Sequence, residues 1–307
     1  MKKRIQNRLA ESRFAFPVMI IYGIAVWLGA GTVAEGAYLQ LAFFVASTLM
    51  MMMLNNTNSL IRIYSRMVSC SFVAITCAAT FLFSSLESCA TGTCFILFYL
   101  SLLRSYQDKR APGIAFYSFA CLGIASLFFV QILYFVPFLW ILMASNMMAL
   151  THRMFWATML GLVMPYWFAV GYYVVTDQFD AFIDHFAELA QFEPLLQYEA
   201  LDIHRIATFA LVALLAVIGI IHYMRNSYLD KIRTRMIFEM FITVDILSFV
   251  FIILQPQHFD NLLPIIIVNT SCLFAHYVAL TRTWLTNVTF IVMCLATLGL
   301  TIFNLMP

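Results

Sequence analysis

Three ionisable side chains interrupt long apolar runs near the C-terminal end of the sequence. Glu239 and Asp245 lie in the run 236–254, and His276 lies in the next one, 262–280. If these runs cross a membrane, a carboxylate at mid-depth costs about 2.5–3.5 kcal/mol and needs a partner inside the protein. In an antiparallel hairpin, His276 reaches the depth of Glu239 or Asp245. An Asp–His pair there predicts a proton relay, with a static bond between helices as the alternative.

The two carboxylates differ in what lies close to them along the chain. Glu239 follows Arg235 by four residues, so an ion pair along one helix is the alternative interpretation of Glu239. Asp245 lies deeper in its run and has no such neighbour. We therefore single out Asp245 and His276 as the residues that would serve a proton- or cation-coupled activity.

The histidines and cysteines do not have the spacing of a metal site. The six His and seven Cys residues form no H-x-x-x-H, H-E-x-x-H or C-x-x-C motif. The sequence also has no Gly-rich loop with a phosphate-binding lysine and no dinucleotide fingerprint. We predict no metal and no other cofactor, and we expect no nucleic-acid partner.

One pair of cysteines has a spacing that allows a disulfide. Cys89 and Cys94 flank Ala90-Thr91-Gly92-Thr93 at the edge of a predicted external loop. An oxidising outer compartment would allow a bridge across that turn. The alternative is two free thiols at the end of one helix.

The composition indicates that these residues lie in a membrane protein. Hydrophobic residues make up 63% of the 307 residues and charged residues only 10%. Soluble domains contain about 45–50% apolar and about 25% charged residues. A soluble fold of this size cannot hide so much apolar surface, so we predict that the bilayer is the solvent for most of the chain.

The apolar runs predict an all-α, polytopic bundle of transmembrane helices that forms a single membrane domain over residues 1–307. Runs of about 17–25 residues suit membrane-spanning helices. We count eleven, with a range of nine to eleven because the pair across 112–150 could instead form a hairpin in one leaflet. The runs are 14–31, 37–54, 67–84, 89–103, 112–129, 133–150, 155–175, 206–223, 236–254, 262–280 and 284–304.

The distribution of basic residues predicts the orientation of this bundle. Eleven spans place sixteen of the seventeen Lys and Arg residues on the side of the N-terminus, and only Arg205 on the other. Cytoplasmic connections carry the excess of Lys and Arg. We therefore predict a multi-pass protein of a bacterial inner membrane with a cytoplasmic N-terminus. The basic tract 1–13 resembles the start of a signal peptide, but the apolar run after it lacks an Ala-x-Ala site, which favours an uncleaved first helix.

The predicted external loop 176–205 combines acidic residues with an aromatic stripe. Phe residues recur there at three- and four-residue steps, which is typical of an amphipathic helix. Such a helix could lie along the membrane interface or dock on the ends of the spans as a lid. It could also form a wall of an outward-facing site, with the acids facing a cation or a hydroxyl-rich ligand. The acids in question are Asp177, Asp180, Asp184 and Glu188.

Roughly a third of the chain carries motifs that resemble those of a known family. Its motifs are Asn55-Asn56 with Asn58, Tyr106-Gln107-Asp108-Lys109, the run 123–128 before Pro137, and Arg153, Gly161 and Pro165-Tyr166. This stretch resembles a family of uncharacterised bacterial polytopic inner-membrane proteins. More distantly, it is similar to the multi-span core of GT-C-like glycosyltransferases that use polyprenyl-phosphate sugars.

The resemblance to transferases implies a catalytic carboxylate in the first external loop. That loop is sizeable in the transferases, whereas here it is about five residues long. Glu35 is its sole carboxylate and would act as the base toward an acceptor hydroxyl. The short loop favours a degenerate, non-catalytic relative over an active enzyme.

Three functions of different classes remain open from the sequence. The first is an envelope protein with a glycan- or lipid-linked role, whose partners would be membrane lipids or a polyprenyl-linked lipid. The second is a proton- or cation-coupled secondary transporter that uses Asp245, His276 and Glu239. The third is a non-catalytic structural or assembly subunit that binds other membrane proteins.

Overall fold

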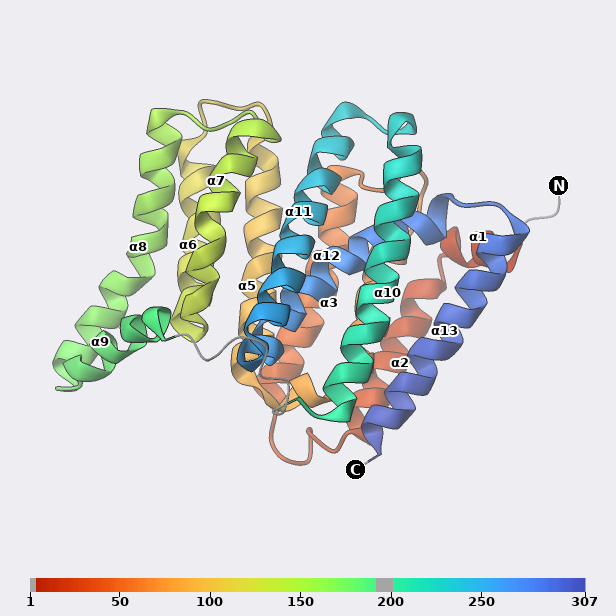
Figure 1. Ribbon diagram of the computed structural model, residues 1–307, viewed down its shortest axis with the longest axis horizontal. Coiled ribbons are helices and arrows are strands. Elements are labelled where there is room, and N and C mark those ends of the chain that lie inside the picture. Colours follow the sequence, from red (N-terminus) through yellow and green to blue (C-terminus); the bar gives the residue numbers. More distant parts are fainter. Residues whose placement is uncertain (1–3, 192–200, 307) are drawn as a thin grey trace.

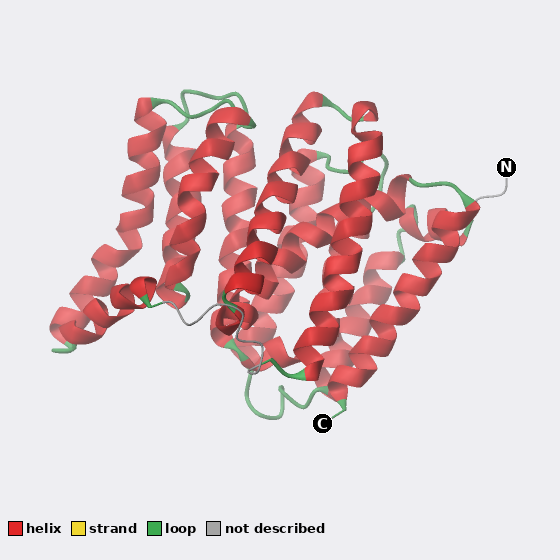
Figure 2. Ribbon diagram, in the orientation of Figure 1, coloured by secondary structure: helices red, strands yellow, loops and turns green. Residues whose placement is uncertain are grey.

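The computed structural model describes residues 4–191 and 201–306, and their regular elements are all helices. Figure 1 shows the long helices side by side in one broad bundle, with the connections gathered at its two ends. Within the described residues there is no strand, as Figure 2 shows, so the predicted all-α fold class is confirmed. Of the predicted external loop, residues 192–200 lie outside the described part.

Helices occupy all eleven apolar runs. An apolar segment without water must pair its backbone groups internally, and a helix does so within a single segment. In chain order the elements are α1 (Ile5–Ala10), α2 (Ala15–Gly29), α3 (Tyr38–Asn58), α4 (Met67–Ala78), η1 (Thr80–Ser84), α5 (Leu86–Leu102), η2 (Leu103–Ser105), α6 (Pro112–Phe128), η3 (Val130–Phe135), α7 (Val136–Ser145), α8 (His152–Val175), α9 (Phe179–Ala187), η4 (Glu188–Ala190), α10 (Ile203–Asn226), η6 (Ser227–Leu229), α11 (Ile232–Leu254), η7 (Pro256–His258), α12 (Phe259–Leu280) and α13 (Trp284–Leu305).

Seven helical segments among the described residues are long and apolar enough to cross a membrane. They contain α3, α5, α8, α10, α11, α12 and α13. The other four runs form shorter apolar helices, in α2, α4, α6 and the pair η3 and α7. The 15 residues of α2 extend only about 22 Å, against a hydrocarbon core of about 30 Å. The described residues therefore contain seven candidate spans, and the predicted count of eleven is not confirmed.

The connections rich in Lys and Arg meet at one end of the bundle, the upper end in Figure 1. Arg62 in the α3–α4 connection donates to Leu229 O in the α10–α11 connection at 3.2 Å. Arg233 donates to Asn58 Oδ1 at 3.1 Å and to Leu103 O at 3.0 Å. We call this the basic end; it also carries α1 and the α7–α8 and α12–α13 connections.

The opposite end, hereafter the acidic end, carries α9 and the first turns of α10 and α12. Arg205 forms a two-pronged ion pair with Asp260, with Nε–Oδ1 and Nη2–Oδ2 distances of 2.9 and 2.8 Å. Ser88 Oγ donates to Asn261 Oδ1 at 3.0 Å. Among the described residues, Arg205 is the one Lys or Arg at this end, and its charge is matched by a carboxylate.

Glycines allow α6 and α8 to pack closely. A Cβ at Gly161 would lie 2.2 Å from Phe116 O, and a Cβ at Gly123 would lie 2.5 Å from Leu162 O. Helices in membranes associate through such small residues, because lipid provides no hydrophobic force to drive their contact. The position of α8, and of α9 that follows it, therefore depends on these two glycines.

The centre of the bundle is α12. The apolar window of this helix is 94% buried, whereas that of α13 is only 17% buried. Polar residues are concentrated on α12 and are fully enclosed, among them Asn269, Thr270, Ser271 and His276. The buried polar groups of this protein are therefore positioned mainly by one central helix.

Candidate functional site

An apolar groove of about 310 Å³ lies between α11 and the segment formed by η3 and α7. Phe138, Val250 and Leu254 on its walls are 44%, 45% and 43% exposed, so the groove opens at the side of the bundle. Its volume is at the lower end of the range of ligand pockets, about 300–1,000 Å³. The complete lining is Tyr134, Phe135, Phe138, Leu247, Val250, Phe251, Leu254 and Gln255.

The groove ends at polar side chains of the α11–α12 connection. Gln255 lines it, and Gln257 Nε2 donates to Gln255 Oε1 at 3.0 Å. The same nitrogen lies 3.2 Å from His258 Nε2. The His258 ring packs edge-on against those of Phe251 and Phe129, with centroid distances of 5.8 and 5.4 Å. The groove thus ends at the buried Gln255, with the exposed Gln257 and the half-buried His258 next to it, and we call this polar end the mouth of the groove.

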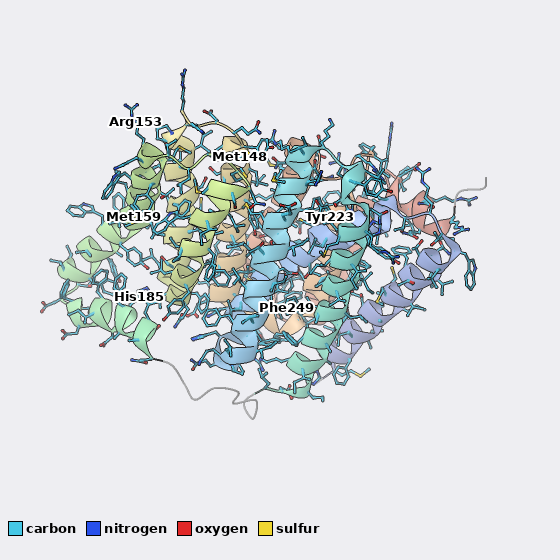
Figure 3. The ribbon with its side chains drawn as sticks, turned by 45° about the horizontal axis from the view of Figure 1, so that its top comes forward. Met148, Arg153, Met159, His185, Tyr223 and Phe249 are labelled. Carbon is cyan, nitrogen blue, oxygen red and sulfur yellow. The ribbon has the colours of Figure 1, made fainter. Side chains whose placement is uncertain are left out.

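The segment α9, which the sequence predicts to be external and which we call the external segment, is docked on the bundle by its aromatic face. The Phe186 ring lies 5.0 Å from that of Tyr166 on α8 and 5.2 Å from that of Phe182 (centroid distances). His185 Nε2 lies 3.0 Å from Ser126 O near the end of α6. Figure 3 labels His185 on this segment and Arg153 at the other end of α8. Docking on the protein's own helices therefore holds α9 in place.

The groove and the external segment share a residue. Tyr134 lines the groove, and its hydroxyl donates to Leu189 O in η4. The acids of the segment are exposed. They are Asp177, Asp180, Asp184 and Glu188. The mouth of the groove is thus bordered by an acidic surface.

Asp245 is fully buried on α11, in the interior of the bundle. Thr270 Oγ1 on α12 lies 3.4 and 3.3 Å from its two carboxylate oxygens. Close by, Tyr99 Oη donates to Asn269 Oδ1 at 2.8 Å. No salt bridge within the described part of the chain includes Asp245. The carboxyl group therefore has a hydroxyl and no cation beside it.

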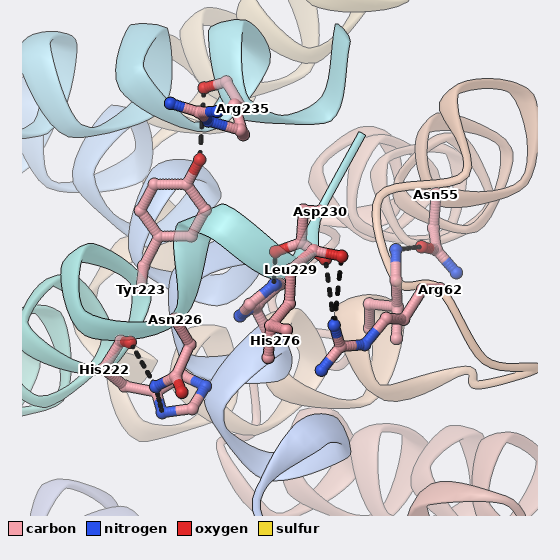
Figure 4. A network of polar contacts seen from close by, with 10 residues as sticks. Asn55, Arg62, His222, Tyr223, Asn226, Leu229, Asp230, Arg235 and His276 are labelled. Atoms are coloured by element: carbon pink, nitrogen blue, oxygen red, sulfur yellow. Dashed lines mark hydrogen bonds and ion pairs between the residues drawn. The ribbon is translucent and has the colours of Figure 1, made fainter. Parts of the chain in front are cut away.

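His276 has a different partner from the one predicted. Its Nε2 lies 2.9 Å from Asp230 Oδ2, and Arg62 Nη1 lies 3.8 Å from Asp230 Oδ1 (Figure 4). The structure therefore pairs His276 with the α10–α11 connection and not with Asp245 or Glu239. His276 and Asp245 lie at different heights along the bundle. Thr270, the residue of α12 that contacts Asp245, precedes His276 by six positions, or about 9 Å along the helix.

A second imidazole faces this pair. The His222 ring on α10 lies 5.5 Å from the His276 ring, centroid to centroid. Neither His276 Nδ1 nor His222 Nε2 has a hydrogen-bond partner among the described residues. No group of three or more His, Cys, Asp and Glu side chains in the described chain could hold a metal ion. The chemistry that this arrangement offers is therefore proton transfer between imidazole and carboxylate.

The other two carboxylates singled out from the sequence lie apart from these groups. Glu239 Oε2 accepts a hydrogen bond from Asn146 Nδ2 at 2.9 Å, which joins α11 to the end of α7. Arg235 Nε has no hydrogen-bond partner among the described residues, so the expected ion pair along the helix is not formed through this nitrogen. Glu35 is exposed in the α2–α3 connection and lines neither the groove nor a smaller cavity beside Trp27.

The two cysteines of the proposed bridge are both free thiols. The sequence analysis placed them across a turn, but α5 begins at Leu86 and includes both Cys89 and Cys94. Residues five apart on a helix face different directions, and their Cα atoms are farther apart than the roughly 7 Å that a disulfide can span. Cys89 Sγ instead donates to Leu82 O at 3.6 Å.

Two features of the site were missed from the sequence. Asp230 is an acid in a connection that otherwise carries Arg225, Lys231 and Arg233, and this isolated opposite charge was a usable signal. Gln255 follows the apolar run directly, but nothing in the sequence showed that it would face the η3 and α7 segment. Its position depends on how helices distant in sequence pack.

Comparison of the chain with models of protein families, with curated proteins and with solved structures gave no match. The class of this protein is therefore described from its fold and its site alone. Among its described residues the chain is all-helical, with seven candidate membrane-spanning helices, a groove on its side and the fully buried Asp245 in its interior.

Proposed function

We propose that this chain is a multi-pass protein of a bacterial inner membrane that binds a lipid with a hydroxyl-rich head group. In this proposal the basic end faces the cytoplasm, because cytoplasmic connections carry the excess of Lys and Arg. The mouth of the groove at Gln255 then lies in the outer leaflet. The observation that carries the proposal is the side groove of about 310 Å³ that ends at polar side chains.

The groove suits a hydrocarbon chain. Its walls are the apolar and aromatic side chains of helices whose neighbours in a membrane are lipid tails. Transfer of a tail from lipid into protein gains little from the hydrophobic effect, so shape and van der Waals packing must select the occupant. Four aromatic rings, those of Tyr134, Phe135, Phe138 and Phe251, shape the groove. A branched isoprenoid chain or an acyl chain fits this description, and the cavity of about 50 Å³ beside Trp27 is too small for either.

The head group must provide the affinity that the tail does not. The amides of Gln255 and Gln257 can donate to hydroxyls and accept from them. The acidic surface of α9 lies beside the mouth, and the charge of Arg205 is already matched by Asp260. A bare phosphate would be repelled there, whereas sugar hydroxyls would be accepted. These charges favour a glycolipid or a lipid-linked sugar over a simple anionic lipid.

The arrangement supports binding rather than transfer of a sugar. The resemblance to polyprenyl-phosphate-sugar transferases would make Glu35 the base, but Glu35 does not line the groove. We therefore propose a glycan- or lipid-linked role in the cell envelope without catalysis by this chain.

The test is native mass spectrometry of the protein purified in mild detergent. Val250→Trp fills the groove, whereas Ile246→Trp places the same ring one turn earlier on α11, at a residue that is 48% exposed and does not line the groove. We expect wild type and Ile246→Trp to retain a lipid with sugar hydroxyls. Val250→Trp should lose at least about tenfold of it, or about 1.4 kcal/mol of binding free energy.

The same experiment can overturn the proposal. Equal lipid in Val250→Trp and in wild type would show that the groove is not the binding site. A lipid phosphate without a sugar would contradict the proposed head group. A protein partner in fixed stoichiometry, with no lipid, would favour a structural or assembly role instead.

A further inference from the structure

We propose that Asp245 is a proton-binding site in the interior of the bundle, which exchanges its proton with the basic end through His276 and Asp230. This site is separate from the groove and does not depend on the lipid-binding function. Its evidence is the burial of Asp245, the nature of its contacts and the position of the imidazoles.

Burial decides the charge of Asp245. The residue is 0% exposed, and the one hydrogen-bond partner of its carboxyl group in the described chain is Thr270 Oγ1, at 3.3 and 3.4 Å. An isolated ionised carboxylate in an apolar interior costs several kcal/mol even after the protein relaxes. A cation must therefore neutralise Asp245 whenever it is in this environment.

The surroundings leave a proton as the cation that fits. Tyr99 on α5 and Cys272 on α12 interact electrostatically with Asp245, and neither bears a positive charge. No salt bridge among the described residues brings a Lys or Arg to it. A hard metal cation takes six or more oxygen ligands, or keeps several waters. Asp245 lines neither cavity and has one side-chain oxygen beside it. A proton needs no additional space.

A route toward the basic end begins at His276. Its Nδ1 is buried and has no partner among the described residues, while its Nε2 contacts Asp230 Oδ2. Asp230 in turn lies 3.8 Å from Arg62, whose side chain is 39% exposed. A proton that leaves the Asp245 carboxyl can bind His276 Nδ1 while Nε2 passes its own proton to Asp230. The imidazole is neutral before and after this step, and the negative charge moves from Asp230 to Asp245.

Aromatic rings close the route in this conformation. The Phe238 ring lies 4.9 Å from the His276 ring, and the Phe241 ring lies 4.9 Å from that of Tyr99, beside Asp245 (centroid distances). Both Phe residues are fully buried, and along α11 they lie between its first turn and Asp245. Proton exchange therefore requires these rings to move, so that occupation of Asp245 is coupled to the conformation of α11 and α12.

Infrared spectroscopy of the reconstituted protein tests the inference. Wild type should show the carbonyl band of a protonated carboxylic acid, which Asp245→Asn should lose and Glu239→Gln should keep. Thr270→Val is nearly isosteric and should keep the band but shift it, because the hydrogen bond from Thr270 is removed. This second variant keeps the test decisive if Asp245→Asn does not fold.

The rate of deuterium exchange of the same band tests the route. His276→Gln should retain the band but exchange at least about tenfold more slowly than wild type, whereas Glu239→Gln should exchange at the wild-type rate. Absence of the band from wild type would overturn the proton site. If sodium stabilises wild type but not Asp245→Asn, the cation bound at Asp245 is a metal ion and not a proton. Unchanged exchange in His276→Gln would overturn the route. Lipid binding by Asp245→Asn should be normal, so failure here is distinguishable from failure of the lipid proposal.

Discussion

His276 Nε2 lies 2.9 Å from Asp230 Oδ2, and the two side chains are only 1% and 2% exposed. The α10–α11 connection, which carries Asp230, thereby contacts the buried face of the central helix α12. Arg62 approaches the same carboxylate from a third segment of the chain. The pair therefore fixes the basic ends of α10, α11 and α12 relative to one another.

Replacement of Asp230 by Ala should destabilise the protein markedly. The variant leaves His276 Nε2 without its partner in a buried position, and hydrogen bonds to charged groups contribute about 1.5–3 kcal/mol each. We expect a loss of about 2–3 kcal/mol, measured as a lower midpoint of thermal unfolding in detergent. Asp108→Ala at the exposed α5–α6 connection is the matched control and should melt as wild type does. Equal midpoints for the two variants would contradict the role of the pair.

Gly161→Ala should weaken the contact between α6 and α8. The added Cβ would lie 2.2 Å from Phe116 O, and the helices must separate to admit it. Overpacking of this kind costs about 1–3 kcal/mol. Gly171→Ala on the same helix is the control, because a Cβ there meets nothing within 4 Å. In a denaturant series, the ratio of folded to unfolded protein should fall for Gly161→Ala and not for Gly171→Ala. An equal fall in both variants would contradict the role of Gly161 in packing.

Phe186→Ala should release the external segment from the bundle. The ring of Phe186 packs on Tyr166, and such aromatic pairs contribute about 0.5–1.5 kcal/mol beyond their buried area. Amide deuterium exchange across α9 should accelerate about fivefold, which corresponds to about 1 kcal/mol of local stability. Ile183→Ala, whose side chain is 53% exposed, should leave the exchange rates unchanged. If both variants exchange as wild type does, other contacts hold the segment.

The proposed orientation predicts which surface an impermeant thiol reagent can reach. In intact cells, after permeabilisation of any outer membrane, the reagent should label Ala181→Cys on α9. It should label Lys109→Cys at the basic end only after the cytoplasmic membrane is opened. Wild type provides the background, since its seven cysteines are free and lie in buried or half-buried positions. The reverse pattern would invert the topology and move the groove mouth to the inner leaflet.

The positions of the helices could be predicted from the sequence, but their lengths could not. Each apolar run forms a helix because an apolar segment without water must pair its backbone groups internally, and a helix does so within one segment. The run 67–84 nevertheless breaks after Ala78, where the 3-10 helix η1 begins, and α6 and η3 meet at Phe129. Hydropathy does not report such breaks, because the residues on both sides are equally apolar. The number of full spans therefore depends on packing that the pattern does not contain.

The candidate residues could be found from the sequence, but their partners could not. Asp245 and His276 stood out because ionisable groups are rare in apolar runs, and both are fully buried. Their pairing depends on the relative height of α11 and α12 and on an inward fold of the α10–α11 connection. Both are tertiary properties. The groove at Gln255 is likewise formed by helices more than a hundred residues apart in the chain.

The enclosure of α12 has a consequence for biogenesis. The helix α12 is apolar enough to be a candidate span, but its Asn269, Thr270, Ser271 and His276 need partners inside the protein, and 94% of its apolar window is buried by the other helices. Because α12 is synthesised late, the helices before it cannot bury their inner faces until α12 packs between them. A chain that ends before residue 259 would thus leave the inner faces of the earlier helices without their central partner.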